Sequence, residues 1–138
     1  MTAIEVDEDE YGSWTVLRVR GELDLVTSPR IRRGVHDAVA VGRHDLVVDL
    51  SGVRFCDSSG VGVLIAARRL LRSCGGSLRL ILPGEAAGAG AGADGGVVVG
   101  AGDAHVDRVL SALGVRRLFE VYGDVDEALT GERARTAP

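Results

Sequence analysis

Apolar and polar residues alternate in two runs at the start of the chain. Ile4 and Val6 alternate with polar neighbours, and the run from Trp14 to Arg20 (WTVLRVR) alternates again. The segment EYGS between them has the composition of a tight turn. A period of two is typical of strands with one buried face, so the chain is predicted to begin with a β-hairpin.

Apolar residues with helical spacing follow in three segments. The first helix is predicted to begin at Ser28, whose hydroxyl can cap it, with Pro29 in the first turn and Gly42 as a stop. The second helix follows Ser59 and ends at Gly75. A third helix is predicted before Gly114. The apolar face comprises Ile31, Val35, Ala38 and Val39 in the first helix, Val63, Ala67, Leu70, Leu71 and Cys74 in the second, and Val106, Val109, Leu110 and Leu113 in the third.

Short apolar runs between the helices predict buried strands. The remaining predicted elements are strands at 46–50, 78–82 and 118–122, a helix from Asp103 as N-cap to Gly114, and a short helix at 125–129. The predicted order is β-β-α-β-α-β-α-β-α. This order favours an α/β fold with a mixed, mostly parallel sheet, entered by an antiparallel hairpin, with helices packed against it.

A tract rich in Gly and Ala interrupts the pattern from Pro83 to about Gly102. It has few bulky residues besides Val97 to Val99, so its burial cannot offset its chain entropy, and a mobile insertion is predicted at 84–102. The tail at 131–138 is predicted to be disordered. Residues 1–130 are then expected to form one domain, in agreement with a length of 138 residues.

Composition and charge narrow the possible functions. Aromatic residues make up only 4% of the chain, so the core must be aliphatic. The net charge is -4 and the 16 basic residues are dispersed along the sequence, which gives no basic block of the kind that nucleic-acid binding requires. The acidic start and the absence of an apolar run of about 20 residues argue against a signal peptide and a membrane span. A cytoplasmic protein without nucleic-acid or membrane partners is expected.

No cofactor, metal site or enzymatic activity is predicted. Cys56 and Cys74 form no metal-ligand pair and are expected to be small buried hydrophobic residues. Residues 90–95 (GAGADG) satisfy the dinucleotide motif GxGxxG, but no strand leads directly into them and no helix leaves them. The P-loop and GxSxG motifs are absent, and none of the three histidines has a sequence partner that would make it a ligand or a base.

One strand-to-helix turn, FCDSSGVGV at 55–63, carries the candidate chemistry. Such turns hold the binding sites of parallel sheets. A purely structural interpretation is that Asp57 or Ser58 caps the following helix and that Gly60 and Gly62 allow a neighbour to approach closely.

The same turn can also be interpreted as a modification site. A cap needs a single acceptor, whereas three hydroxyl or carboxylate groups lie together here, followed by two glycines that leave them uncovered. A phosphate on a hydroxyl at a helix N-terminus is stabilised by about 0.3 to 2 kcal/mol through the helix dipole and free N–H groups. The residues alone leave both interpretations open.

Three segments together resemble the STAS domain family, specifically the bacterial anti-sigma factor antagonists. GELDLVTSP at 21–29 resembles the GELD segment before the first helix of the family. VVDLSGVRFCDSSGVGVL at 47–64 is similar to its central strand, turn and Asp-Ser-Ser-Gly site. VDRVLSALGVRRLFEVYGDVDEAL at 106–129 resembles its C-terminal helix, strand and helix. The resemblance extends from about Ile4 to Leu129 and is broken only by the Gly/Ala tract.

This resemblance implies an adaptor that binds an anti-sigma factor serine kinase, with ATP bound by the partner, and so frees a sigma factor. The kinase would phosphorylate the second serine of the motif, Ser59, and a PP2C-type phosphatase would remove the phosphate. The partner-binding residues would be Asp24, Asp57, Ser58, Ser59, Gly60 and Gly62. An alternative is a constitutive STAS interaction subunit of a stressosome-like or transporter complex, in which the serines only cap the helix.

Overall fold

The computed structural model describes residues 3–82 and 101–131, without the side chains of 101–104. Its elements are β1 (Ile4–Tyr11), β2 (Trp14–Leu23), α1 (Ser28–Ala40), β3 (Asp45–Cys56), α2 (Ser58–Ser73), β4 (Ser77–Ile81), α4 (Ala101–Ala112), the 3-10 helix η2 (Arg116–Leu118), β5 (Glu120–Tyr122) and α5 (Val125–Thr130). The predicted insertion and tail therefore lie outside the described residues, apart from Ala101 and Gly102, which begin α4, and Gly131, which ends α5.

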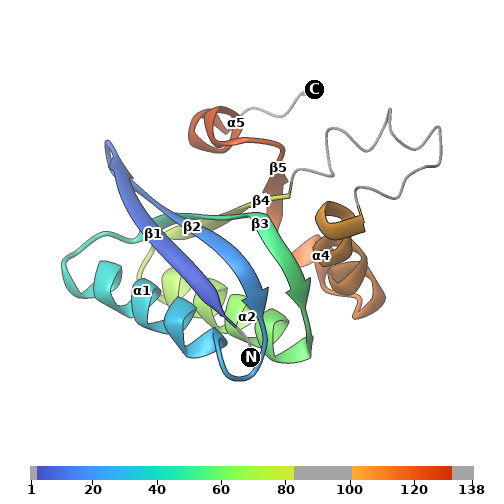
Figure 1. Ribbon diagram of the computed structural model, residues 1–138. Helices are drawn as coiled ribbons and strands as arrows, with labels where there is room; N and C mark the ends of the chain where they lie inside the picture. The colour runs from blue at the N-terminus through green and yellow to red at the C-terminus, as the bar shows by residue number, and fades with distance from the viewer. Residues whose placement is uncertain (1–2, 83–100, 132–138) are drawn as a thin grey trace.

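The strands form a single five-stranded sheet in the order β1-β2-β3-β4-β5. β1 and β2 pair antiparallel, and the other three pairings are parallel, as the sequence predicts. Helices α1 and α2 cover one face, α5 lies on the other face, and α4 packs beside β3 (Figure 1). The parallel pairing of β2 with β3 brings the end of β2 next to the end of β3, where α2 begins.

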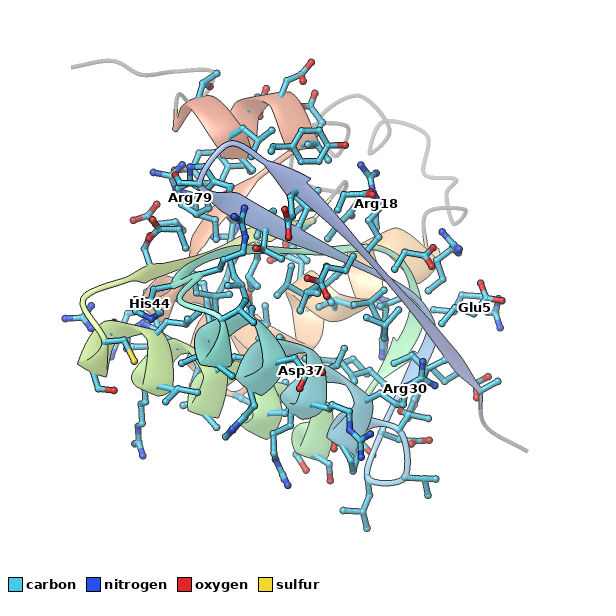
Figure 2. All side chains as sticks on the ribbon, turned by 90° about the vertical axis from the view of Figure 1, so that its left-hand side faces the viewer. Glu5, Arg18, Arg30, Asp37, His44 and Arg79 are labelled. Atoms are coloured by element: carbon cyan, nitrogen blue, oxygen red, sulfur yellow. The ribbon has the colours of Figure 1, made fainter. Side chains whose placement is uncertain are left out.

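The core has two parts, one on each face of the sheet. The larger part is aliphatic and fills the space between the sheet and α1, α2 and α4. The smaller part, under α5, comprises Val16, Val47, Ile81, Tyr122 and Ala128. Arg79 closes this smaller part: its guanidinium carbon lies 4.3 Å from the Trp14 ring centroid and 5.5 Å from that of Tyr122, and its Nη1 donates to the Ala128 carbonyl at 2.6 Å. In Figure 2 Arg79 lies on the sheet beneath α5.

Two predicted helix caps are wrong. The N-cap of α1 is Thr27 rather than Ser28, and it makes no capping bond because its hydroxyl donates to the Glu22 carbonyl at 2.7 Å. Ser28 is instead buried, and it lies in the first turn with the predicted proline, which is exposed. Asp103 is not the cap of the third predicted helix, because α4 already begins at Ala101.

Two strand lengths and one burial prediction also differ from the structure. β3 extends six residues beyond the predicted end at Leu50 because it stays paired with β2 as far as Cys56. β5 starts at Glu120 rather than at residue 118, since η2 occupies the preceding residues. Cys56 is buried as predicted, but Cys74 is only half-buried, because it is the C-cap residue beyond the last turn of α2.

Replacing Arg79 with Ala is expected to lower the free energy of unfolding by about 1 to 3 kcal/mol. The variant loses two ring contacts and leaves the Ala128 carbonyl without its donor. Arg18→Ala is the matched control, because Arg18 forms an exposed pair with Asp9, and such pairs contribute less than about 1 kcal/mol. Urea unfolding measures both variants, and equal losses would contradict the assigned role of Arg79.

Candidate functional site

The start of α2 is capped by Asp57. Its Oδ1 accepts the N–H of Ser59 at 2.9 Å and that of Gly60 at 3.1 Å, which confirms the predicted cap. Ser58 is the first helical residue and is exposed, while Ser59 is half-buried. Neither serine hydroxyl forms a hydrogen bond within the described parts of the chain. The cap therefore needs only one of the three polar side chains, and both hydroxyls remain available.

The end of β2 is attached directly to this turn. The Asp57 N–H donates to the Leu23 carbonyl at 3.2 Å. A Cβ on Gly60 would lie 2.7 Å from Leu23 Cγ and 2.9 Å from the Leu23 carbonyl oxygen, so this position requires glycine. Gly62 differs, because it is exposed and a Cβ there would meet nothing within 4 Å. Gly60 is thus required by the fold, whereas the described fold places no steric demand on Gly62.

Asp24 shapes the loop between β2 and α1. Its Oδ1 accepts the N–H groups of Val26 and Thr27, each at 3.0 Å, and the Asp24 N–H donates to the Thr27 hydroxyl at 2.9 Å. The side chains of Leu25 and Val26 are left 72% and 74% exposed beside the start of α2. The sequence resemblance placed Asp24 near the site, but the two apolar side chains were not predicted to belong to it. Two apolar residues in a strand-to-helix loop could have indicated an exposed apolar surface there.

Phe55 and His105 form the other side of the site. Phe55, near the end of β3, is 44% exposed, and its ring stacks on that of His105 with centroids 5.6 Å apart and an interplanar angle of 20°. His105 Nε2 lies 3.2 Å from the carbonyl oxygen of Cys56. His105, for which the sequence gave no partner, therefore joins α4 to the residue that precedes the cap. Fifty residues separate the stacked rings in sequence, so only the fold reveals the contact.

The thiol at the site is kept neutral. Burial, with a smaller contribution from the charge of Asp57, raises the pKa of Cys56 from 9.0 to about 12. A thiol is nucleophilic only as the thiolate, so Cys56 is a packing residue at neutral pH.

The arrangement suits a hydroxyl that receives a group from another protein. Within residues 3–82 and 101–131, no base is hydrogen-bonded to either serine hydroxyl. The N–H groups of Ser59 and Gly60, which were expected to be free to hold a phosphate, are already taken by Asp57. A phosphate on Ser59 would therefore lie beside a carboxylate and could not use these two N–H groups, although the helix dipole would favour it.

Comparison with known proteins gives the family. The STAS domain profile matches residues 5–87, more than half of the chain, so the chain belongs to the STAS domain family. It is 27% identical over 131 residues to the anti-sigma-F factor antagonist RsfB of Mycobacterium tuberculosis, covering 95% of this chain and 91% of that protein. This relative bears the class name that the sequence resemblance had suggested.

Solved structures agree with the fold. An anti-sigma factor antagonist from Mycobacterium paratuberculosis superimposes with a TM-score of 0.72 at 26% identity, covering 94% of this chain and 93% of that one. SpoIIAA in its unphosphorylated form shares the fold with a TM-score of 0.67 at 20% identity, covering 92% and 95% of the two chains. In the part of the chain that the structure describes, no helix is long and apolar enough to cross a membrane.

The two cysteines are expected to differ in reactivity. At pH 8.5 a thiol reagent should modify half-buried Cys74 readily and Cys56 only after unfolding, as measured by mass spectrometry. Since the folded pKa of Cys56 is raised, its contribution to stability is present below pH 9 and is lost as the pH rises toward 12. Rapid modification of Cys56 in a folded Cys74→Ser variant would contradict this assignment.

The two glycines provide a matched pair of substitutions. Gly60→Ala is expected to destabilise the fold by about 1 to 3 kcal/mol, because its Cβ would overlap Leu23. Gly62→Ala is expected to be neutral or to stabilise α2 by up to about 1 kcal/mol, because alanine favours the helix and the space is open. Urea unfolding of the two variants measures the difference, and similar effects would show that the packing around Gly60 is not tight.

Proposed function

We propose that this STAS domain is an anti-sigma factor antagonist. In its unphosphorylated form it binds an anti-sigma factor serine kinase and so releases a sigma factor, and phosphorylation of Ser59 by that kinase ends the binding. A PP2C-type phosphatase restores the active form. The observation that carries the proposal is the start of α2, where Asp57 alone caps the helix and leaves two serine hydroxyls unbonded. The names of RsfB and of the Mycobacterium paratuberculosis protein support the class.

The surroundings of Ser59 support a protein-binding surface. Leu25 and Val26 are exposed on one side of the turn and Phe55 on the other. Exposed apolar side chains around a polar centre are the kind of groups that a partner protein buries. We infer that these three side chains supply much of the affinity and that Ser59 controls it.

The position of Ser59 explains how a phosphate would act as a switch. Phosphorylation adds about -1.5 to -2 charges at pH 7. Asp57 already occupies the nearest N–H groups, so the fold offers the phosphate little compensation and the partner must supply it. An imperfectly paired phosphate in an interface costs on the order of 2 to 5 kcal/mol of binding, or roughly 30- to 5,000-fold in the dissociation constant.

The second serine is the better candidate on geometric grounds as well as by resemblance. Ser59, Ala66 and Leu70 share one side of α2, since they are seven and four residues apart. Ala66 and Leu70 line the groove between α2 and α1. Ser59 therefore lies on the side of α2 that lines this groove, whereas the adjacent Ser58 is about 100° away around the helix.

The assignment predicts a single phosphate. With ATP and the cognate kinase, the chain should gain one phosphate on Ser59, the Ser59→Ala variant should gain none, and the matched Ser58→Ala variant should be modified like the unaltered chain. Intact-mass measurement and peptide mapping read out all three. Phosphate on Ser58 alone would overturn the choice of serine.

Isolation of the protein from its own cells separates the proposal from a constitutive interaction subunit. In that case the protein isolated from its own cells would carry no phosphate, and it would be recovered with a transport or scaffold complex rather than with a kinase. That result would contradict the proposed switch.

A further inference from the structure

Helices α1 and α2 carry a concentration of positive charge that the sequence conceals. The arginines are dispersed along the chain, but the packing of α1 against α2 brings six of them into one layer, and none of the six is buried. The only acidic residue of the two helices is Asp37. These six residues form the arginine face: Arg30, Arg32, Arg33, Arg68, Arg69 and Arg72.

The arginines of this face form no ion pair with the described parts of the chain. The ion pairs among those parts use other arginines, and no member of the arginine face takes part in one. Most acidic residues of β1 are paired within the hairpin and its neighbourhood: Arg20 holds Glu5 and Asp7, and Arg18 holds Asp9. In Figure 2 Arg30 lies in the helix layer, whereas Arg18 and Glu5 lie on the hairpin.

The arginine face also contains a small hollow with an apolar floor. Its volume is about 60 Å³, enough for part of one apolar side chain. Arg32 and His36 of α1 flank it, and Ala66 and Leu70 of α2 form part of the floor. Along α2, Arg69 is ten residues from Ser59, or about 15 Å at 1.5 Å per residue. A protein interface of ordinary size, about 800 Å² on each side, can cover both Ser59 and the arginine face.

We propose that the arginine face binds an acidic segment of the same partner that contacts Ser59, with an apolar side chain of that segment in the hollow. The inference rests on the proposed function and adds the chemistry of the partner. Arginine pairs with carboxylates through two parallel hydrogen bonds, and such a surface speeds association by electrostatic steering.

A protein fits this surface better than a nucleic acid or a membrane does. The chain as a whole carries a net charge of -4, which opposes the approach of an extended polyanion. Neither α1 nor α2 contains a Phe, Tyr or Trp, the side chains that most often stack on bases or anchor at a lipid interface. A short acidic segment of a protein is repelled less by the net charge than an extended polyanion is. It also binds arginines without aromatic stacking.

The test uses two double variants with the same change of net charge. Arg32→Glu with Arg69→Glu alters the arginine face, and Arg108→Glu with Arg117→Glu alters exposed positions on α4 and η2. Association of each unphosphorylated protein with the cognate anti-sigma factor kinase is followed by rapid mixing at low and high salt. The first pair should slow association about 10- to 100-fold at low salt and flatten its salt dependence, whereas the second should change it by less than about 3-fold.

The outcomes distinguish this inference from the proposed function. If the unaltered chain binds the kinase and phosphorylation weakens the complex, but both double variants associate alike, the arginine face is not the docking surface and the proposed function stands. If the unaltered chain does not bind the kinase, the proposed function fails and the inference fails with it. Arginine-dependent binding to phosphatidylglycerol vesicles or duplex DNA, without an effect on kinase association, would also overturn the inference. Equal urea unfolding of the two double variants confirms that folding is not the cause.

Discussion

The site depends on the connection between Asp57 and the end of β2. The Asp57 side chain closes the first turn of α2 through the N–H groups of Ser59 and Gly60, and its own N–H bonds the Leu23 carbonyl. Gly60 lets Leu23 pack against the same turn without a Cβ in between. This junction fixes where α2 starts relative to the sheet. It does so without the serine hydroxyls, which form no hydrogen bond among residues 3–82 and 101–131.

Three segments that are distant in sequence meet around this junction. The loop after β2 is held by Asp24 and presents Leu25 and Val26 outward, and the end of β3 presents Phe55. His105 attaches α4 to the same strand by ring stacking and through the Cys56 carbonyl. A partner that contacts Ser59 would therefore touch three segments that side-chain and backbone contacts hold together.

The sequence predicted the regular parts of this fold because they follow from local patterns. The order of elements and the hairpin follow from the spacing of apolar residues. The cap at Asp57 follows from a single polar residue at the start of a helix. The cap at Ser28 was wrong because Thr27 takes the N-cap position, with its hydroxyl bonded to the Glu22 carbonyl, and the cap at Asp103 was wrong because α4 begins two residues earlier. The arginine face and the Phe55–His105 stack could not be predicted from spacing, since each joins segments that only the parallel crossovers bring together.

The most direct test of the account is the affinity of the chain for its anti-sigma factor kinase before and after modification of Ser59. Titration calorimetry with the unmodified protein and with protein phosphorylated only at Ser59 gives both dissociation constants. A switch centred on this residue predicts an increase of at least about 30-fold on phosphorylation, which corresponds to about 2 kcal/mol. Equal affinity of the two forms would contradict the central claim.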